Sequence, residues 1–187
     1  MNETQAFEQV KQALKPKRFE HTIRVVTTAE KLQNRFGGNL EVIRMAAILH
    51  DYAKYRPVEE MKQEVRANDE LPLEILDYGE EILHAFVGSV YLKKELQVTD
   101  NRILDAVSYH TTGRAGMTLE EKIVFLADYI EPGRTFKQAA LVREIAEKNL
   151  NQACFTSLGF TIQFLAGKGL PIYPDTFIGY NDLYKQI

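Results

Sequence analysis

The residues of this chain that could carry chemistry are histidines and aspartates on well-separated segments. The chain contains four histidines, which are His21, His50, His84 and His110. Asp51 directly follows His50, and Asp128 is embedded in the apolar run of residues 123–130. Transition metals accept imidazole and carboxylate ligands together, whereas a carboxylate buried without a partner is strongly destabilising. We therefore interpret the chain as a helical metal-dependent hydrolase.

The surroundings of the His50-Asp51 pair are more informative than the dipeptide itself, which is weak evidence alone. Residues 42–49 are apolar at every position except Arg44, so Asp51 cannot easily reach water. Lys54 follows Asp51 by three positions and His50 by four, which places all three residues on one side of a helix. A cation beside metal ligands indicates an anionic substrate. The alternative is a simple ion pair between Lys54 and Asp51.

The other candidates also allow structural interpretations. Asp128 lies near the end of its expected helix, where the helix dipole disfavours a carboxylate, so a cation is its better partner. His21 lies at the edge of an apolar arc and His84 among apolar neighbours, and both would fit a core without a ligand. His110 precedes residues 111–114, a turn whose hydroxyl and cationic groups suit phosphate oxygens. Residues 167–175 could clamp a nucleobase or could simply turn the chain.

Helices must position these residues, because helical spacing dominates the chain and strand alternation is nowhere sustained. Thr118 and Glu121 form a capping-box pattern that predicts a helix start, and this helix should end before Pro132. Residues 55–78 hold two prolines, which predicts short helices and loops. The other predicted helices cover residues 16–36, 40–55, 79–96, 101–110 and 137–166, the last with a possible break at 149–151. The predicted fold is all-α.

Composition excludes several classes of protein. With 187 residues, of which 45% are hydrophobic, we expect one domain with a sizeable core. A net charge of -3 argues against a nucleic-acid-binding protein, which usually has a strongly basic face. The single cysteine, Cys154, excludes an internal disulfide and a Cys-x-x-Cys zinc site. We expect a cytoplasmic location, because the sequence shows neither a signal peptide nor a run long enough to span a membrane.

Several short strings together resemble the HD-domain superfamily of metal-dependent phosphohydrolases. They are FEHT at 19–22, LHDYAK at 49–54, HAFVG at 84–88, YHTTGR at 109–114, EKI at 121–123, LADYIEPGR at 126–134 and PIYPD at 171–175. Within the superfamily they resemble the YqeK-type bacterial family, whose members are symmetrical bis(5′-nucleosyl)-tetraphosphatases. The similarity covers roughly residues 16–180 and departs from the pattern at no ligand position. It implies a helical HD-domain bundle, one domain over residues 1–187 with its core at about 16–180.

The resemblance also implies the roles of individual residues. The metal, commonly iron in this family, would be bound by His21, His50, Asp51 and Asp128. His84 and His110 would complete a second metal position or hold phosphate, so that one or two ions would bind, and manganese or cobalt could replace iron. The nucleotide and its phosphates would contact Asp51, Lys54, Thr111, Arg134, Gly169, Leu170, Pro171, Ile172, Tyr173, Pro174 and Asp175.

The reaction implied by the resemblance is the symmetrical hydrolysis of diadenosine tetraphosphate, and of related dinucleoside polyphosphates, to two ADP. The expected assembly is a homodimer, with neither nucleic acid nor membrane as a partner. Three alternatives remain open at this point. The chain could be another nucleotidase or phosphodiesterase, which a product assay would reveal. It could be a nucleotide-sensing module that binds without hydrolysis, or an all-helical adaptor whose histidines are structural and bind no metal.

Overall fold

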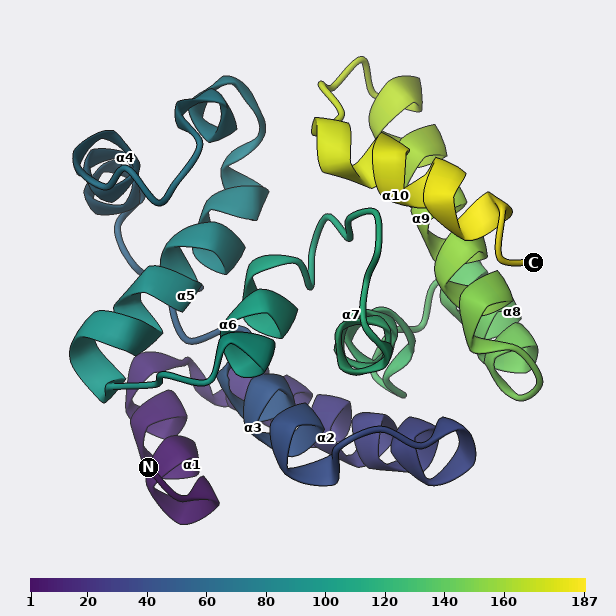
Figure 1. Cartoon of the computed structure of the whole chain (residues 1–187), viewed down its shortest axis with the longest axis horizontal. Coiled ribbons are helices and arrows are strands. Elements are labelled where there is room, and N and C mark those ends of the chain that lie inside the picture. Colours follow the sequence, from purple (N-terminus) through teal and green to yellow (C-terminus); the bar gives the residue numbers. More distant parts are fainter.

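The computed structural model describes residues 1–187, and every regular element in it is a helix. The prediction of an all-α fold is therefore confirmed. Ten α-helices and two short 3-10 helices follow one another along the chain (Figure 1). Their bounds are α1 Glu3–Ala13, α2 Pro16–Phe36, α3 Leu40–Leu49, α4 Val58–Ala67, η1 Leu73–Asp77, η2 Glu80–Ile82, α5 Leu83–Leu96, α6 Asn101–Ser108, α7 Leu119–Ile130, α8 Lys137–Ala146, α9 Leu150–Gly167 and α10 Pro174–Tyr184.

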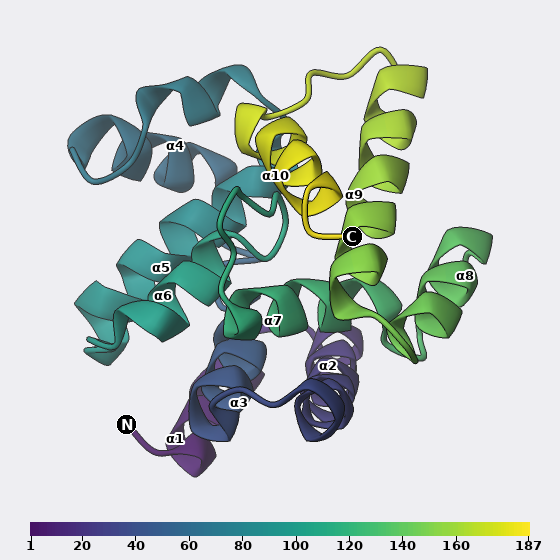
Figure 2. The ribbon, with the colours of Figure 1, turned by 45° about the vertical axis from the view of Figure 1, so that its right-hand side comes forward.

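Helix α7 occupies the middle of the molecule. It packs against α2 and α3 on one side, against α6 on another, and against α8 and α9 on a third (Figure 2). The reason lies in its sequence, because Ile123, Val124 and Leu126 are all fully buried. The buried hydrophobic side chains form one cluster of 46 residues, and it includes Ala6 of α1 and Leu183 of α10. None of the helices combines the length and the apolar character that crossing a membrane needs.

Capping side chains mark several of the helix starts that the sequence predicts. The Thr118 side chain accepts from the backbone N–H of Glu121, and the Glu121 side chain reaches back to Thr118, so the predicted capping box is present. Asn149 caps α9, which confirms the suspected break in the long pattern of residues 137–166. Helix α2 has Pro16 in its first turn and ends at Gly37, whose φ of 85° suits a residue without Cβ.

Two predicted helices end earlier than their apolar patterns indicate. Helix α3 ends at Leu49 and not at residue 55, because Nδ1 of His50 donates to the carbonyl of Ala47 at 2.8 Å. That carbonyl would otherwise accept the next bond of the helix, from the N–H of Asp51. Likewise Nδ1 of His110 lies 2.6 Å from the carbonyl of Val107, and α6 ends at Ser108. The prediction that Lys54 lies on the same helix as His50, one turn further along, was therefore wrong.

Other boundaries also differ from the prediction. Residues 79–82 begin as the 3-10 helix η2, and the α-helix starts only at Leu83. Helices α1 and α10 were not predicted. The segment of residues 167–175, expected to be a loop, turns at Gly169 with a φ of 66° but is already helical from Pro174. Proline explains this start, since it lacks the N–H that a first helical turn leaves unbonded.

Candidate metal centre

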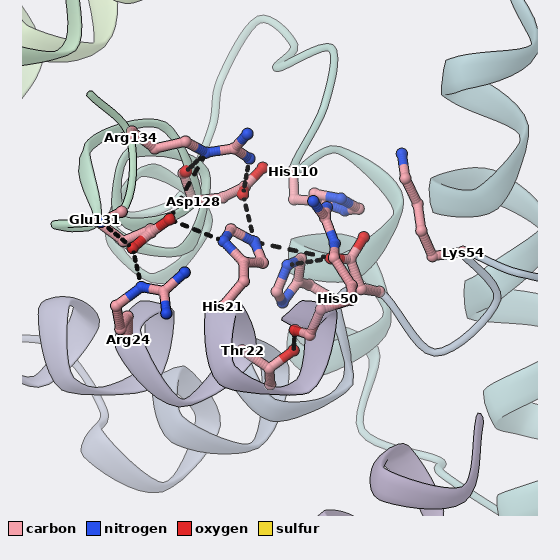
Figure 3. Close-up of polar contacts among 12 residues, drawn as sticks. His21, Thr22, Arg24, His50, Lys54, His110, Asp128, Glu131 and Arg134 are labelled. Atoms are coloured by element: carbon pink, nitrogen blue, oxygen red, sulfur yellow. Dashed lines mark hydrogen bonds and ion pairs between the residues drawn. The ribbon is translucent and has the colours of Figure 1, made fainter. Parts of the chain in front are cut away.

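Four of the predicted ligands reach one buried point from three directions (Figure 3). His21 comes from the second turn of α2, His50 and Asp51 follow the end of α3, and Asp128 lies in the last turn of α7. His50 and Asp51 are fully buried and His21 is 5% exposed. The side chain of Asp128 keeps 16% of its surface exposed, so the cluster meets solvent on the α7 side.

The ligand atoms lie at the separations that a shared cation requires. Nε2 of His21 is 3.0 Å from Oδ1 of Asp128, and Nε2 of His50 is 3.0 Å from Oδ2 of Asp51. Two ligands that bind one ion at right angles, each at roughly 2.1 Å, lie about 3 Å apart. Nε2 of His21, Nε2 of His50 and Oδ1 of Asp51 are buried and have no hydrogen-bond partner. Buried polar atoms without partners are rare, and a bound cation would satisfy all three.

His84 and His110 extend the cluster on the far side of Asp51. Their Nε2 atoms lie 3.2 Å apart, and Nε2 of His84 is 3.3 Å from Oδ1 of Asp51. The cluster contains three sets of possible ligands, and within each set the ligand atoms lie within 4.8 Å of one another. The sets are His21, His50 and Asp51; His50, His110 and Asp128; and Asp51, His84 and His110. His50, Asp51 and His110 each belong to two of these sets, so the three sets form one continuous cluster.

The electrostatics favour ionised carboxylates and a neutral His110, whereas Asp51 raises the pKa of His50 against the effect of burial. Burial would raise the pKa of Asp51, but His50, His84 and Arg18 hold it well below the usual value. Burial acts in the same way on Asp128, and His21 and Arg134 hold its pKa well below the usual value. Burial, together with the neighbouring His50 and His84, lowers the pKa of His110 to about 3. Neutral imidazole and ionised carboxylate are the forms that bind a metal.

Three cationic side chains lie around the cluster. Nη2 of Arg134 binds Oδ1 of Asp128 at 2.6 Å, and Nε of Arg18 binds Oδ2 of Asp51. Nζ of Lys54 lies 2.8 Å from Oε2 of Glu81 and 3.5 Å from Nδ1 of His84. Lys54 thus does not form the ion pair with Asp51 that was its structural alternative. All three side chains are partly exposed, so an anion could reach them from solvent.

The remaining predicted residues lie at different distances from this cluster. Oγ1 of Thr111 is 3.2 Å from Nε2 of His110 and therefore borders the cluster directly. Tyr173 is farther away, and its ring meets the ring of Phe86, which in turn meets Tyr109. No hydrogen bond or ion pair joins the other residues of 169–175 to the histidines. Leu170 is 49% exposed, and burial raises the pKa of the Asp175 carboxyl.

Sequence reasoning missed three residues beside the centre: Arg18, Arg24 and Glu131. Arg18 lies one turn before His21 on α2, so helical spacing could have indicated it. Glu131 belongs to the LADYIEPGR string but received no role. Its side chain is 2% exposed, and Oε1 lies 3.0 Å from Nδ1 of His21. The contact of Arg24 with Glu131 spans 107 residues, and nothing in the local sequence signals it.

Comparison with known proteins now identifies the family. The HD domain model matches residues 18–133, a range that contains all four histidines together with Asp51 and Asp128. The chain belongs to the HD-domain family. Binding of a divalent metal follows from membership, and the unpartnered atoms of His21, His50 and Asp51 fit such an ion. Arg134 and the segment of residues 169–175 lie beyond the matched range.

Relatives of this HD-domain chain are similar over nearly its whole length. A protein of Bacillus subtilis (strain 168) named symmetrical bis(5′-nucleosyl)-tetraphosphatase is 48% identical, over 97% of each chain. A protein of Halalkalibacterium halodurans with the same name is 45% identical, over 100% of this chain and 99% of its own. A crystal structure of a predicted HD superfamily hydrolase involved in NAD metabolism, from Clostridium acetobutylicum, is 33% identical. It superposes with a TM-score of 0.93 over 100% of this chain and 99% of that chain.

Proposed function

We propose that this HD-domain protein is a metal-dependent symmetrical bis(5′-nucleosyl)-tetraphosphatase, which hydrolyses diadenosine tetraphosphate and related dinucleoside polyphosphates to two ADP. The observation that carries the proposal is the convergence of His21, His50, Asp51 and Asp128 on one buried point, with orphaned ligand atoms facing one another. Support for the substrate comes from relatives with this name that are 45–48% identical. A binding module without catalytic activity has no need for such a centre.

In this proposal His21, His50, Asp51 and Asp128 bind the first ion, and His84 and His110 complete a second position or hold phosphate. Iron is the proposed metal, with manganese or cobalt as substitutes, because imidazole with carboxylate suits these ions. When bound, the ion lowers the pKa of a water molecule and polarises the phosphoryl group. Four histidines and two aspartates are thus available as ligands. Among them only Asp128 keeps a sizeable exposed surface, so solvent reaches the centre at Asp128 and the cationic side chains around it.

The protein's own residues hold and orient the substrate. Lys54, Arg134 and the hydroxyl of Thr111 neutralise and position the phosphate oxygens at the open side of the centre. The segment of residues 169–175 and the aromatic ring of Tyr173 hold one nucleoside end. With one ADP half held in this way, an inner phosphorus is the one presented for attack. Water adds to this phosphorus, the bond to the bridging oxygen breaks, and the second ADP leaves.

Product analysis tests the proposed reaction. The protein is purified without oxygen, its metal content is measured, and it is incubated with diadenosine tetraphosphate in water enriched in oxygen-18. We expect two ADP, with the label on the β-phosphate of one of them. Formation of AMP and ATP, or no turnover with iron, cobalt or manganese, would contradict the proposal. NAD belongs in the same assay, because the name of the Clostridium acetobutylicum relative refers to NAD metabolism. Faster cleavage of NAD would favour a different nucleotidase.

We also propose that the protein forms a homodimer through the outer end of the α9–α10 hairpin. Helix α9 has no charged residue over 18 positions, in a chain that is 26% charged, yet Phe164 is 59% exposed. Phe177 and Ile178, at the start of α10, are exposed as well. Two copies related by a two-fold axis bring identical patches together, and an uncharged apolar patch does so without repulsion.

The mass of the protein in solution, measured by light scattering, tests the dimer. Phe164→Glu should convert a dimer to a monomer, because it places two like charges at the contact. Leu40→Glu is the matched control, since Leu40 is also exposed but belongs to α3, which packs against α1, α2, α6 and α7. A monomeric wild type, or a dimeric Phe164→Glu variant, would contradict this interface.

With a net charge of -3 we propose neither nucleic acid nor membrane as a partner. We place the protein in the cytoplasm, where its proposed nucleotide substrates are found.

A further inference from the structure

One buried carboxylate beside the centre does not face the proposed ion. Glu131 is the residue at which α7 ends, and only 1% of its surface is exposed. Its Oε1 lies 3.0 Å from Nδ1 of His21, on the side of the ring opposite to the ligand atom Nε2 (Figure 3). A carboxylate that touches a proposed ligand from behind, in a buried position, calls for an explanation beyond the ion pair it forms with Arg24.

Two of the other histidines, His50 and His110, have a backbone carbonyl where His21 has Glu131. Nδ1 of His50 and Nδ1 of His110 each lie beside a backbone carbonyl three residues earlier, at the end of a helix. His21 lies inside α2, where the carbonyls take part in the helix. The carbonyl of Arg18, three residues before His21, also accepts a hydrogen bond from the hydroxyl of Thr22. The ring of His21 makes no hydrogen bond to its own helix, and Glu131, at the end of another helix, lies at its Nδ1 instead.

Glu131 is held firmly enough to act as that acceptor. Its Oε2 lies 2.6 Å from Nε of Arg24 and 2.6 Å from the backbone N of Gly133. Its backbone carbonyl accepts from Arg143 of α8 at 2.9 Å. A Cβ at Gly133 would lie 2.6 Å from Nη2 of Arg24, so this guanidinium packs directly against the glycine. The ion pair with Arg24 and the N–H of Gly133 stabilise the ionised form of the Glu131 carboxylate.

We propose that Glu131 is a positioning residue of the metal centre, which accepts the Nδ1 proton of His21 and thereby directs the Nε2 lone pair toward the ion. The inference rests on the proposed metal site and adds to it a residue that does not bind the ion. The hydrogen bond selects one tautomer and one orientation of the ring, and the negative charge makes the imidazole a stronger ligand. The competing explanation is that Glu131 only ties α2 to the end of α7 through Arg24.

Metal release separates the two explanations without measuring turnover. Wild type, Glu131→Ala, Glu131→Gln and Arg24→Met are loaded with cobalt(II), and the loss of its visible absorption is followed after a chelator is added. Loss of a carboxylate behind a ligating histidine weakens metal binding by about 10- to 100-fold. We expect release from Glu131→Ala to accelerate by about this factor. Glu131→Gln, which keeps the shape and an acceptor oxygen but not the charge, should lie between this variant and wild type.

Arg24→Met is the matched control, because it removes the tie between α2 and α7 and leaves the contact of Glu131 with His21 in place. We expect near wild-type release from this variant, with a cobalt spectrum unlike those of the Glu131 variants. Release as fast as that of Glu131→Ala would show that the tie alone matters and would overturn the inference. So would wild-type release from Glu131→Gln, which decides the matter even if Glu131→Ala does not fold. A wild type that binds no cobalt would instead refute the metal site itself.

Discussion

At the scale of single residues, His50 shows how one side chain can both shape the backbone and face a candidate metal site. Its Nδ1 binds the carbonyl of Ala47, and its Nε2 is buried without a hydrogen-bond partner. We expect His50→Ala to lose most of its bound metal and all of its activity while it keeps its helix content, because α3 is held by apolar packing. Metal analysis and circular dichroism check this. Cys154→Ala, a buried change outside the cluster, is the control, and equal metal content in His50→Ala would refute the ligand assignment.

Lys54 allows a separate test of phosphate binding at the same scale. Its ammonium group lies beside Glu81 and His84 and contacts no proposed first-ion ligand. We expect Lys54→Met to weaken binding of ADP about 10-fold and to leave the metal content unchanged, because a charge-assisted hydrogen bond is worth about 1.5–3 kcal/mol. Lys62→Met is the control, since Lys62 is similarly exposed and forms ion pairs with Glu59 and Glu80 but contacts none of the histidines. Titration calorimetry measures the ADP affinity of the two variants and of the wild type. Unchanged affinity in Lys54→Met would remove Lys54 from the phosphate site. Arg134→Met is less clean, because Arg134 also binds Asp128.

At the scale of elements, α10 packs tightly against the turn that follows His110. A Cβ on Gly179 would lie 2.9 Å from the backbone carbonyl of Arg114. We expect Gly179→Ala to destabilise the protein by about 1–3 kcal/mol, the usual cost of overpacking. It should also weaken ADP binding, since α10 carries the end of the 169–175 segment. Gly167→Ala, with open space around the new methyl group, should be close to neutral. Urea unfolding compares the two, and equal stabilities would mean that α10 shifts without cost.

At the scale of the whole molecule, Cys154 reports on the packing of α9 against α7. It is fully buried, and its Sγ lies 3.7 Å from the carbonyl of Lys122. Burial raises the pKa of the Cys154 thiol to about 12. The unfolded chain loses this proton near pH 8.5, so the contribution to stability is complete below that pH and declines as the pH rises toward 12. We expect a loss of about 1–2 kcal/mol by pH 10.

Urea unfolding at pH 7.5, 9 and 10 measures this decline. The Cys154→Ala variant should be less stable at pH 7.5 because of the lost packing, but its stability should fall less between pH 7.5 and 10. The wild-type thiol should also react with a thiol reagent only after unfolding. Parallel pH dependence in the two proteins, or rapid labelling of the native chain, would mean that the α7–α9 contact opens in solution.

The sequence by itself determined the kinds of residue at the centre, the helical class and several helix starts. These features are local. Thr118 and Asn149 cap the helices that directly follow them, and Gly37 ends the helix that precedes it. The early ends at Leu49 and Ser108 were not predicted, because a histidine ring that binds a carbonyl of its own helix leaves the apolar pattern unchanged. The assignment of His21, His50, Asp51 and Asp128 as ligands stays a prediction until metal is measured.

Only the tertiary structure decided which groups meet. Nδ1 of His21 contacts a carboxylate 110 residues away, and Arg18 reaches Asp51 across 33 residues. Such contacts depend on how α2, α3 and α7 pack around a common core, and the periodicity of a single helix contains no information about its neighbours. The same packing excludes water from the facing nitrogen and oxygen atoms. A set of residues that lies scattered along the sequence thereby becomes one site, in which burial leaves Nε2 of His21, Nε2 of His50 and Oδ1 of Asp51 without a hydrogen-bond partner.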